Sequence, residues 1–426
     1  MSQLEQLYHA VVFNVQGGVH VATVVDEFSE LTKSSCITQT PLIILNGSGT
    51  SPDFKNEVVR KLIAAFPSTK AERVVDTHAN MPVQGGFATK ELLDHNRISA
   101  FVVFTAKENL SSLLLVLPTV FTSVYHMRVK VYGDGDVNTL AILANIGESM
   151  KTSIKQKCSE YLAEVNSIPQ DKVEVIRSAI ICDKTFSHGF STRKGGCSSY
   201  PSVMSLNLAF TPEKRDPLIA VEENRDRLLK AVGCSSHRFE LAKAVHGNCV
   251  WTVGSPEPPG YDAIVCDKQG VVIAAPAADC VTIIFADANR SVCAVAHSGW
   301  KGILANVTGA TIDTMTKCFG CNIQDIRAAI GPSIGVCCYE IGMDVEKLFG
   351  DNSLLRQCIE VVEGRCKRHL NLQNSVRLQL LDAGISSENI DDSPSKLCTY
   401  CNEDMFFSYR RDGKPFGTHV GFIALR

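Results

Sequence analysis

Three residues whose side chains bind soft metal ions stand beside small residues in the second half of the sequence. His246 lies in AVHG, Cys280 in PAADCVTIIFAD and His297 in AVAHSGWKG. We expect each at the end or joint of a strand, where a sheet holds the side chain and a loop gives access to it. One cysteine and two histidines suit zinc and leave a fourth position for water or substrate. Their separations of 34 and 17 residues match no local zinc finger, so spacing alone leaves a purely structural role open for each residue.

Two CxxC pairs offer an alternative use of cysteine as a metal ligand. Cys318 with Cys321, and Cys398 with Cys401, have the spacing found in closed structural zinc sites. The two pairs lie far apart along the chain. Whether they share one site stays open at this point.

The elements that must position these residues indicate an α/β chain, with α+β as the other possibility. Strands are predicted at 10–15, 19–25, 41–47, 72–77, 98–106 and 129–134, and helices at 53–66 and about 137–165. The Pro-containing turn NSIPQDK, residues 166–172, follows the long helix and predicts a domain boundary. We therefore expect a smaller α/β domain over 1–170 and a catalytic domain over 175–426.

Cysteine usage supports this division into two regions. Of 17 cysteines only Cys36 and Cys158 precede residue 175, so 15 lie in the remainder. An odd count, in a chain whose first residues lack the pattern of a secretory signal, argues for reduced thiols rather than a disulfide framework. We expect a cytoplasmic protein.

Composition limits the class of partner. The chain of 426 residues is 45% hydrophobic and 20% charged, as in ordinary globular proteins, and its net charge is -3. This balance gives no electrostatic reason to expect nucleic acid as a partner. The most apolar run, 113–121, is too short for a membrane span and contains Pro118, so it is predicted to be buried core. A small-molecule partner is favoured.

The glycine-rich turn in LIILNGSGTS, residues 42–51, follows a predicted strand and precedes a predicted helix. Backbone N–H groups in such a turn can cradle phosphate. The segment lacks the third glycine of a dinucleotide fingerprint and the Gly-Lys-Ser/Thr of a P-loop. A plain tight turn is therefore the favoured interpretation.

Eight further motifs occur in order over residues 180–426: FSHGFSTRKGGCSS, SLNLAF, AVHG, YDAIV, APAADCVTIIFAD, AVAHSGWKGILANV, AIGPSIGVCCYEIG and FFSYRRDGKPFG. Together they resemble the YfiH/YlmD family of laccase-domain proteins. The resemblance implies an α/β catalytic domain with zinc bound by His246, Cys280 and His297. It also implies phosphorolysis of adenosine, inosine and 5'-methylthioadenosine, and deamination of adenosine. On this reading His297 ends its strand as a ligand, and Gly299 lets the chain turn away from the site.

Other residues supply what such chemistry requires. Arg193, beside Gly195 and Gly196, is a candidate for binding phosphate, although a turn arginine at the surface would look the same. Asp262 and Asp279 are candidates for moving protons during deamination, although aspartates often only satisfy backbone donors.

Weaker candidates complete the predicted site. Lys301 and either Arg410 or Arg411 are further cations for phosphate, and Asn207 in SLNLAF is predicted to order the site. Bacterial relatives commonly have Gln, Ala and Arg where this chain has Ala244, Ser298 and Lys301. Because lysine lacks the planar fork of arginine, this change weakens the case for bidentate phosphate binding at Lys301.

Two other functions compete with the purine nucleoside enzyme. A multicopper oxidase needs several close histidine sets including His-x-His pairs, whereas no two of the 11 histidines are separated by a single residue. The zinc interpretation is therefore better than the copper one. The chain could instead be a non-catalytic adaptor whose N-terminal domain binds protein partners. The expected small partners are purine nucleosides and phosphate.

Overall fold

The computed structural model describes residues 8–15, 19–33, 37–46, 52–66, 73–77, 83–133, 135–136, 142, 146–165, 172–211 and 215–426. The chain divides into two compact units. The N-terminal unit comprises Met1–Ile168 together with two later segments, Ser199–Pro201 and Phe210–Ala220. The C-terminal unit comprises Pro169–Ser198, Ser202–Ala209 and Val221–Arg426.

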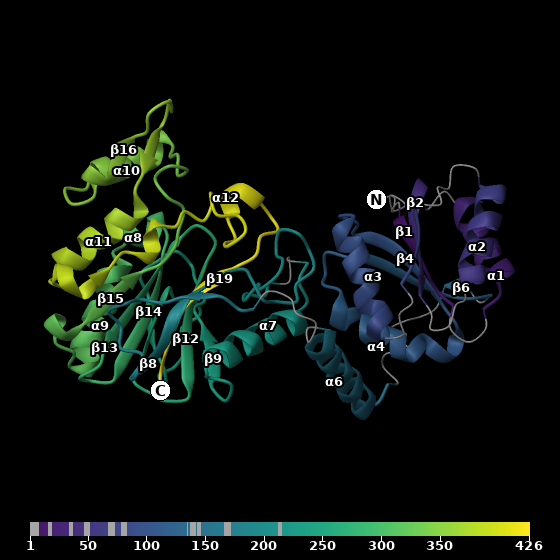
Figure 1. The fold of residues 1–426 in the computed structure, drawn as a ribbon, viewed down its shortest axis with the longest axis horizontal. Helices are drawn as coiled ribbons and strands as arrows, with labels where there is room; N and C mark the ends of the chain where they lie inside the picture. Colours follow the sequence, from purple (N-terminus) through teal and green to yellow (C-terminus); the bar gives the residue numbers. More distant parts are fainter. Residues whose placement is uncertain are drawn as a thin grey trace. The chain divides into compact units, whose positions relative to one another are not determined.

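The N-terminal unit is built on a six-stranded sheet with the order β3-β2-β1-β4-β5-β6, in which only β6 runs antiparallel to its neighbour (Figure 1). Its strands are β1 (Tyr8–Asn14), β2 (Ile37–Asn46), β3 (Val74–Asp76), β4 (Ala100–Thr105), β5 (His126–Val131) and β6 (Gly135–Asp136). Its helices are α1 (Val21–Lys33), α2 (Pro52–Ala65), α3 (Val83–His95), α4 (Leu110–Val120) and α6 (Glu148–Val165), with a 3-10 turn at Lys107–Asn109. Parallel strands joined by helices make this an α/β unit.

One predicted strand of this unit is wrong. Residues 19–25, rich in β-branched residues, run into helix α1, which begins at Val21. The buried residues Val21, Val24, Phe28 and Leu31 recur at helical spacing, and packing of that face outweighs the intrinsic preference of valine for strands.

The apolar run at 113–121 lies almost entirely in α4 and is mostly buried, as predicted. Among the described residues, no helix is both long enough and apolar enough to cross a membrane. The glycine-rich segment 42–51, for which a plain tight turn is the favoured interpretation, falls largely on residues 47–51, which lie outside the described residues.

The C-terminal unit contains two main sheets. A six-stranded sheet has the order β10-β11-β14-β13-β15-β18, and a five-stranded sheet has the order β7-β8-β19-β12-β9. The strands of the first are β10 (Val250–Thr252), β11 (Ala263–Cys266), β13 (Val281–Asp287), β14 (Val292–Ser298), β15 (Arg327–Ile330) and β18 (Ile390–Asp391). Those of the second are β7 (Val175–Ile176), β8 (Phe186–Ser191), β9 (Arg238–Leu241), β12 (Val271–Ala277) and β19 (His419–Leu425).

Helices and a small hairpin complete this unit. The helices are α7 (Leu218–Ala231), α8 (Trp300–Leu304), α9 (Val307–Phe319), α10 (Met343–Gly350), α11 (Leu372–Asp382) and α12 (Tyr409–Asp412). Strands β16 (Ile359–Val361) and β17 (Arg368–Leu370) pair with each other. Short 3-10 turns occupy Ile323–Asp325, Arg356–Cys358, Ser387–Asn389 and Pro394–Lys396.

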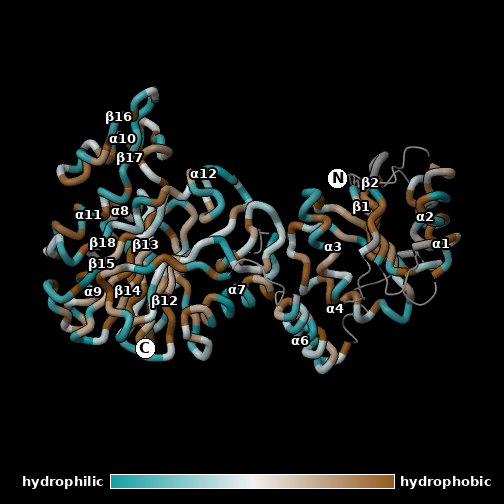
Figure 2. The backbone as a smooth tube through the Cα atoms, viewed as in Figure 1, coloured by the Kyte–Doolittle hydropathy of each residue, from teal (hydrophilic) through white to brown (hydrophobic). Residues whose placement is uncertain are grey.

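Alternating side chains of the central strands explain how these elements form layers. In β13, Ile284 belongs to the core between the two sheets, whereas Ile283 and Phe285 belong to the core shared with α9 and α11. Successive residues of a strand point to opposite faces, so a strand buried on both sides must be apolar throughout. The strands in Figure 2 are accordingly mainly brown. The mixed α/β fold agrees with the prediction.

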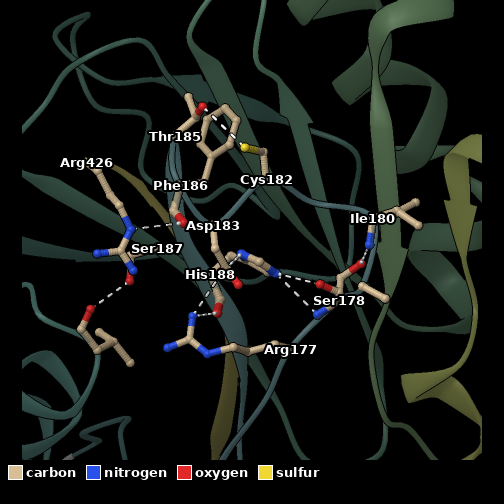
Figure 3. Close-up of polar contacts among 12 residues, drawn as sticks. Arg177, Ser178, Ile180, Cys182, Asp183, Thr185, Phe186, Ser187, His188 and Arg426 are labelled. Carbon is tan, nitrogen blue, oxygen red and sulfur yellow. Dashed lines mark hydrogen bonds and ion pairs between the residues drawn. The ribbon is translucent and has the colours of Figure 1, made fainter.

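Polar contacts hold strand β8, which lies between β7 and β19 in the five-stranded sheet (Figure 3). The ring of His188 is fully buried, and its Nε2 lies 3.2 Å from the backbone nitrogen of Ser178. The backbone nitrogen of Arg426, the last residue, donates to the carbonyl of Thr185 at 3.0 Å. These contacts hold both ends of the C-terminal unit's chain against the same strand.

Candidate metal and nucleoside site

The three predicted metal ligands meet at one place in the C-terminal unit. Cys280 immediately precedes β13, His297 is the penultimate residue of β14, and His246 lies in the loop between β9 and β10. Their ligand atoms all lie within 4.8 Å of one another. Because β13 and β14 are antiparallel neighbours, with Thr282 opposite His297, residues 17 apart in sequence become adjacent.

A buried carboxylate fixes the loop that carries His246. The Oδ1 atom of Asp262 accepts from the backbone nitrogen of His246 at 2.8 Å, and Oδ2 accepts from Gly247 at 2.8 Å and Val245 at 3.2 Å. His246 has a φ of 61°, a left-handed conformation that is uncommon for a residue with a side chain. The three N–H contacts to one carboxylate hold this conformation.

The same carboxylate orients His297. Nδ1 of His297 donates to Oδ1 of Asp262 at 2.8 Å, and the backbone nitrogen of His297 donates to the carbonyl of Asp262 at 2.7 Å. A hydrogen bond at Nδ1 leaves Nε2 as the nitrogen available to a metal, which is the usual arrangement for a histidine ligand.

Electrostatics favours a thiolate at Cys280. Burial by itself raises the pKa of this thiol, but the neighbouring His297 and His246 lower it by more, so that it falls to about 6. Burial lowers the pKa of His297, whereas Cys280 and Asp262 raise it to about 9. A thiolate and two imidazoles on a rigid sheet edge form a donor set that fits zinc, with His246 exposed to solvent on one side.

Gly299 is needed for space rather than for a special turn. Its φ is -75°, which any residue can adopt, so the backbone conformation does not require glycine here. A Cβ atom at this position would lie 2.9 Å from Sγ of Cys280 and 3.1 Å from Cδ2 of His246. Only glycine lets the start of α8 approach the ligands this closely.

Asp279 connects the ligand Cys280 to two later segments. Its Oδ1 accepts from Oγ1 of Thr399 at 2.7 Å, and its Oδ2 accepts from the backbone nitrogen of Arg410 at 2.7 Å. The side chain is 8% exposed, so both carboxylate oxygens are engaged inside the protein. Thr399 was not predicted, although the FFSYRRDG motif that contains Arg410 follows it closely.

Tyr339 is a further residue that the sequence analysis missed. Burial, and then the charge of Cys280, raise its pKa to about 12. The guanidinium of Arg410 lies over its ring at 5.2 Å from the centroid and is otherwise exposed. Tyr339 lies in the motif AIGPSIGVCCYEIG, which could have identified it from the sequence. Arg410 is thereby placed close to the ligand group.

Arg193 and Asn207 hold backbone segments together. Nε of Arg193 donates to the carbonyl of Met204 at 2.7 Å, Nη1 donates to that of Glu403 at 3.0 Å, and the guanidinium lies over Phe407. Asn207 is fully buried, and its Oδ1 accepts from the backbone nitrogen of Thr418 at 2.9 Å.

The remaining predicted residues separate from one another. Lys301 is exposed on α8, with its ammonium 5.4 Å from the centre of the neighbouring Trp300 ring.

The two CxxC pairs do not share a site. Sγ atoms of Cys398 and Cys401 instead lie with those of Cys337 and Cys338. The sequence spacing could not reveal this partnership, because strand pairing rather than local spacing creates it.

Comparison with known proteins shows which family the chain resembles in sequence. A family model described as "Multi-copper polyphenol oxidoreductase laccase" matches residues 187–426. The human protein named purine nucleoside phosphorylase LACC1 is 33% identical over 346 residues, covering 80% of this chain and 79% of that protein. A protein from an unknown prokaryotic organism, named adenosine deaminase RL5, is 35% identical over 155 residues, covering 36% of this chain and 58% of that protein.

Solved structures match the same part of the chain. The crystal structure of YlmD from Geobacillus stearothermophilus has a TM-score of 0.52 and 28% identity, covering 61% of this chain and all of that one. The fold and the sequence therefore match the same family. The chain belongs to the laccase-domain family that includes YlmD and YfiH.

Proposed function

We propose that this chain is a zinc-dependent purine nucleoside enzyme. It phosphorolyses adenosine, inosine and 5'-methylthioadenosine, and it deaminates adenosine. The observation that carries the proposal is the convergence of His246, Cys280 and His297, with ligand atoms within 4.8 Å of one another. The names of the relatives, purine nucleoside phosphorylase and adenosine deaminase, support the substrate class.

The chain's own residues define what the site can do. His246, Cys280 and His297 would hold zinc, which when bound supplies an electrophilic centre with an open coordination position. In phosphorolysis the bond from the ribose C1' to the base breaks, a bond from C1' to a phosphate oxygen forms, and the base takes up a proton. In deamination water adds to the purine and ammonia leaves.

We assign Asp262 and Asp279 to positioning rather than to proton transfer. Both carboxylates are buried, and each oxygen already accepts a hydrogen bond from within the protein. A carboxylate whose acceptor sites face the protein is poorly placed to exchange protons with a substrate. Asp262 orients His297 and the His246 loop, and Asp279 fixes the residue before Cys280.

For phosphate, the geometry favours Arg410 over Arg193. Two donors of Arg193 are committed to carbonyls at 2.7 and 3.0 Å, and burial lowers its pKa. Arg410 is exposed, and its guanidinium lies over the Tyr339 ring and 3.3 Å from the Glu340 carbonyl. Its backbone nitrogen joins it to the ligand group through Asp279. An arginine with donors left to face solvent can bind an anion bidentately.

The competing functions receive less support. Within the described part of the chain, the groups of His, Cys and acidic residues that could hold a metal are the His246 group and a four-cysteine group. Neither supplies the clustered histidines of a trinuclear copper centre. A non-catalytic adaptor remains the alternative that the experiment must exclude.

The test is direct. Purified protein is incubated with inosine and phosphate, and hypoxanthine and ribose 1-phosphate are sought by mass spectrometry; adenosine without phosphate should give inosine. Replacing Cys280 with Ala should lower zinc content and reduce both activities by roughly a hundredfold or more, since loss of supporting residues alone costs about ten- to a hundredfold. Cys318→Ala, at an exposed position on α9, is the matched control and should change neither.

Two outcomes would overturn the proposal. Full turnover in metal-free Cys280→Ala protein would remove the zinc assignment. Zinc-loaded, folded protein that turns over no purine nucleoside would favour the adaptor.

A further inference from the structure

Four cysteines outside the proposed catalytic site meet at a second position in the C-terminal unit. Cys337 and Cys338 lie in the segment between β15 and α10, and Cys398 and Cys401 follow the 3-10 turn that ends at Lys396. All four Sγ atoms lie within 4.8 Å of one another. Sγ of Cys401 lies 3.3 Å from that of Cys338 and 3.9 Å from that of Cys337.

These separations suit four thiolates around one ion. Zn–S bonds of about 2.3 Å in a tetrahedron place the sulfur atoms roughly 3.8 Å apart. The separations of 3.3 and 3.9 Å lie on either side of that value, and both are far longer than the bond of about 2.05 Å in a disulfide. Cys398 and Cys401 also have the two-residue spacing of structural zinc sites.

The backbone around the sulfurs is shaped for them. The nitrogen of Gly335 donates to Sγ of Cys398 at 3.2 Å. A Cβ atom at Gly335 would lie 3.2 Å from Sγ of Cys337 and 3.1 Å from Cβ of Cys398, so a side chain there would crowd the cluster. Backbone N–H groups aimed at sulfur stabilise its thiolate form.

Binding of a divalent ion by four cysteines displaces their protons. The ion then compensates the charge of thiolates that would otherwise repel one another.

We propose that Cys337, Cys338, Cys398 and Cys401 form a second, structural zinc site in the C-terminal unit. All four positions are filled by protein, so this site is closed, and it takes no part in binding substrate. It is independent of the catalytic function proposed above.

The two segments that carry the four cysteines also contact Asp279, the residue before Cys280. Thr399, next to Cys398, donates to Oδ1 of Asp279, and its backbone nitrogen donates to the carbonyl of Ser333 at 3.0 Å. The nitrogen of Ile334 donates to the carbonyl of Asp279 at 2.9 Å. A metal that ties the two segments together therefore braces the residue before Cys280 from both sides.

The experiment counts metal in the full chain, purified under reducing conditions. We expect about two zinc ions per chain, about one in Cys280→Ala and about one in Cys401→Ser. The double variant should hold almost none, so loss of either site is distinguished from loss of the other. Cys318→Ala, from the unused CxxC pair, should keep about two.

A second measurement uses the unaltered chain, because Cys401→Ser could fail to fold. Apo protein reloaded with cobalt should show the intense charge-transfer absorption of a tetrathiolate site, and Cys280→Ala should retain it. One zinc in the wild-type chain, a zinc count unchanged by Cys401→Ser, or a Cys338–Cys401 disulfide in the native protein would each overturn the proposal.

Discussion

Each unit contains a completely buried carboxylate, Asp94 in the N-terminal unit and Asp262 in the C-terminal unit, and the two have different surroundings. Asp262 in the C-terminal unit accepts from three backbone nitrogens and from Nδ1 of His297. Asp94 in the N-terminal unit accepts from the side chains of Lys90, Tyr125 and Ser199 and lies 3.6 Å from Nη1 of Arg215. Asp262 holds the His246 loop and orients the ligand His297, whereas Asp94 compensates the charges of Lys90 and Arg215.

Asp262 therefore belongs to the candidate metal site, whereas Asp94 connects separate segments of the N-terminal unit. The guanidinium of Arg215 lies over the rings of Tyr125 and Tyr200, at 5.0 and 4.7 Å from their centroids. Burial, and then the charge of Asp94, raise the pKa of Tyr125, which therefore stays a donor. Asp94 thus fastens the segments Ser199–Pro201 and Phe210–Ala220 within the N-terminal unit.

The largest expected effect is on stability. Asp94→Ala leaves Lys90 and Arg215 buried without a counter-ion, which should destabilise the N-terminal unit by about 3 to 5 kcal/mol. Asp94→Asn still accepts from Tyr125 or Ser199 and should cost less. Circular dichroism during denaturation measures the loss.

Tryptophan fluorescence tells the units apart. Both tryptophans of the chain, Trp251 and Trp300, lie in the C-terminal unit. Asp94→Ala should therefore lower the denaturant concentration at the unfolding midpoint more when unfolding is followed by circular dichroism than when it is followed by fluorescence. If Asp94→Ala unfolds like the wild type by both probes, the ionic cluster around Asp94 contributes nothing to stability.

The second prediction concerns metal affinity. Asp262→Asn places an amide donor against backbone N–H groups and Nδ1 of His297, so zinc affinity should fall about ten- to a hundredfold. Competition with a chelator measures it. Asp287, fully buried at the far end of β13 and bonded to the backbone nitrogens of Asn289 and Arg290, is the matched control. An equal loss in Asp287→Asn would show a general effect on the sheet.

The ligand group could be predicted from sequence because of its local pattern. His246, Cys280 and His297 each sit beside strand-like apolar runs, and the resemblance to a family selected them from 28 cysteines and histidines. The strands at 41–47 and 98–106 were likewise confirmed, because apolar runs between turn residues leave few alternatives.

The roles of the polar residues could not be predicted in the same way. Whether Asp262 faces substrate or backbone depends on the fold of the His246 loop, and sequence does not encode that direction locally. The link from Asp94 to Arg215, and the meeting of Cys337 with Cys401, join segments far apart in the chain. Such contacts follow from tertiary packing, which periodicity does not report.

The third prediction distinguishes the two arginines. Arg410→Ala should weaken phosphorolysis of inosine about ten- to a hundredfold, the value of a charged hydrogen bond to phosphate, and affect deamination of adenosine much less. Arg193→Ala should instead weaken both reactions alike, since it frees the carbonyls of Met204 and Glu403. Steady-state kinetics of both reactions provides the measurement. Selective loss of phosphorolysis in Arg193→Ala would return the phosphate role to Arg193.

The smallest effect concerns a buried group that, unlike Asp94 and Asp262, lacks polar partners. His419 is 1% exposed, and Phe406 and Phe407 flank its ring. Among the described residues, neither ring nitrogen has a hydrogen-bond partner. Burial, and then the positive charges of Arg193 and Arg411, lower its pKa to about 3 from an ordinary value of 6.5.

Because this pKa is lower in the folded than in the unfolded chain, the unfolded state binds the proton first as pH falls. His419 should therefore reduce the free energy of unfolding between about pH 6 and pH 4 by roughly 1 kcal/mol per pH unit, with no contribution above that range. His419→Gln has no titratable group and should unfold with a shallower dependence on pH, followed by tryptophan fluorescence in the C-terminal unit. Identical slopes in wild type and variant would mean that the ring is protonated, or solvated, in the folded protein. Burial of His419 would then not be the cause of the loss of stability of this unit at low pH.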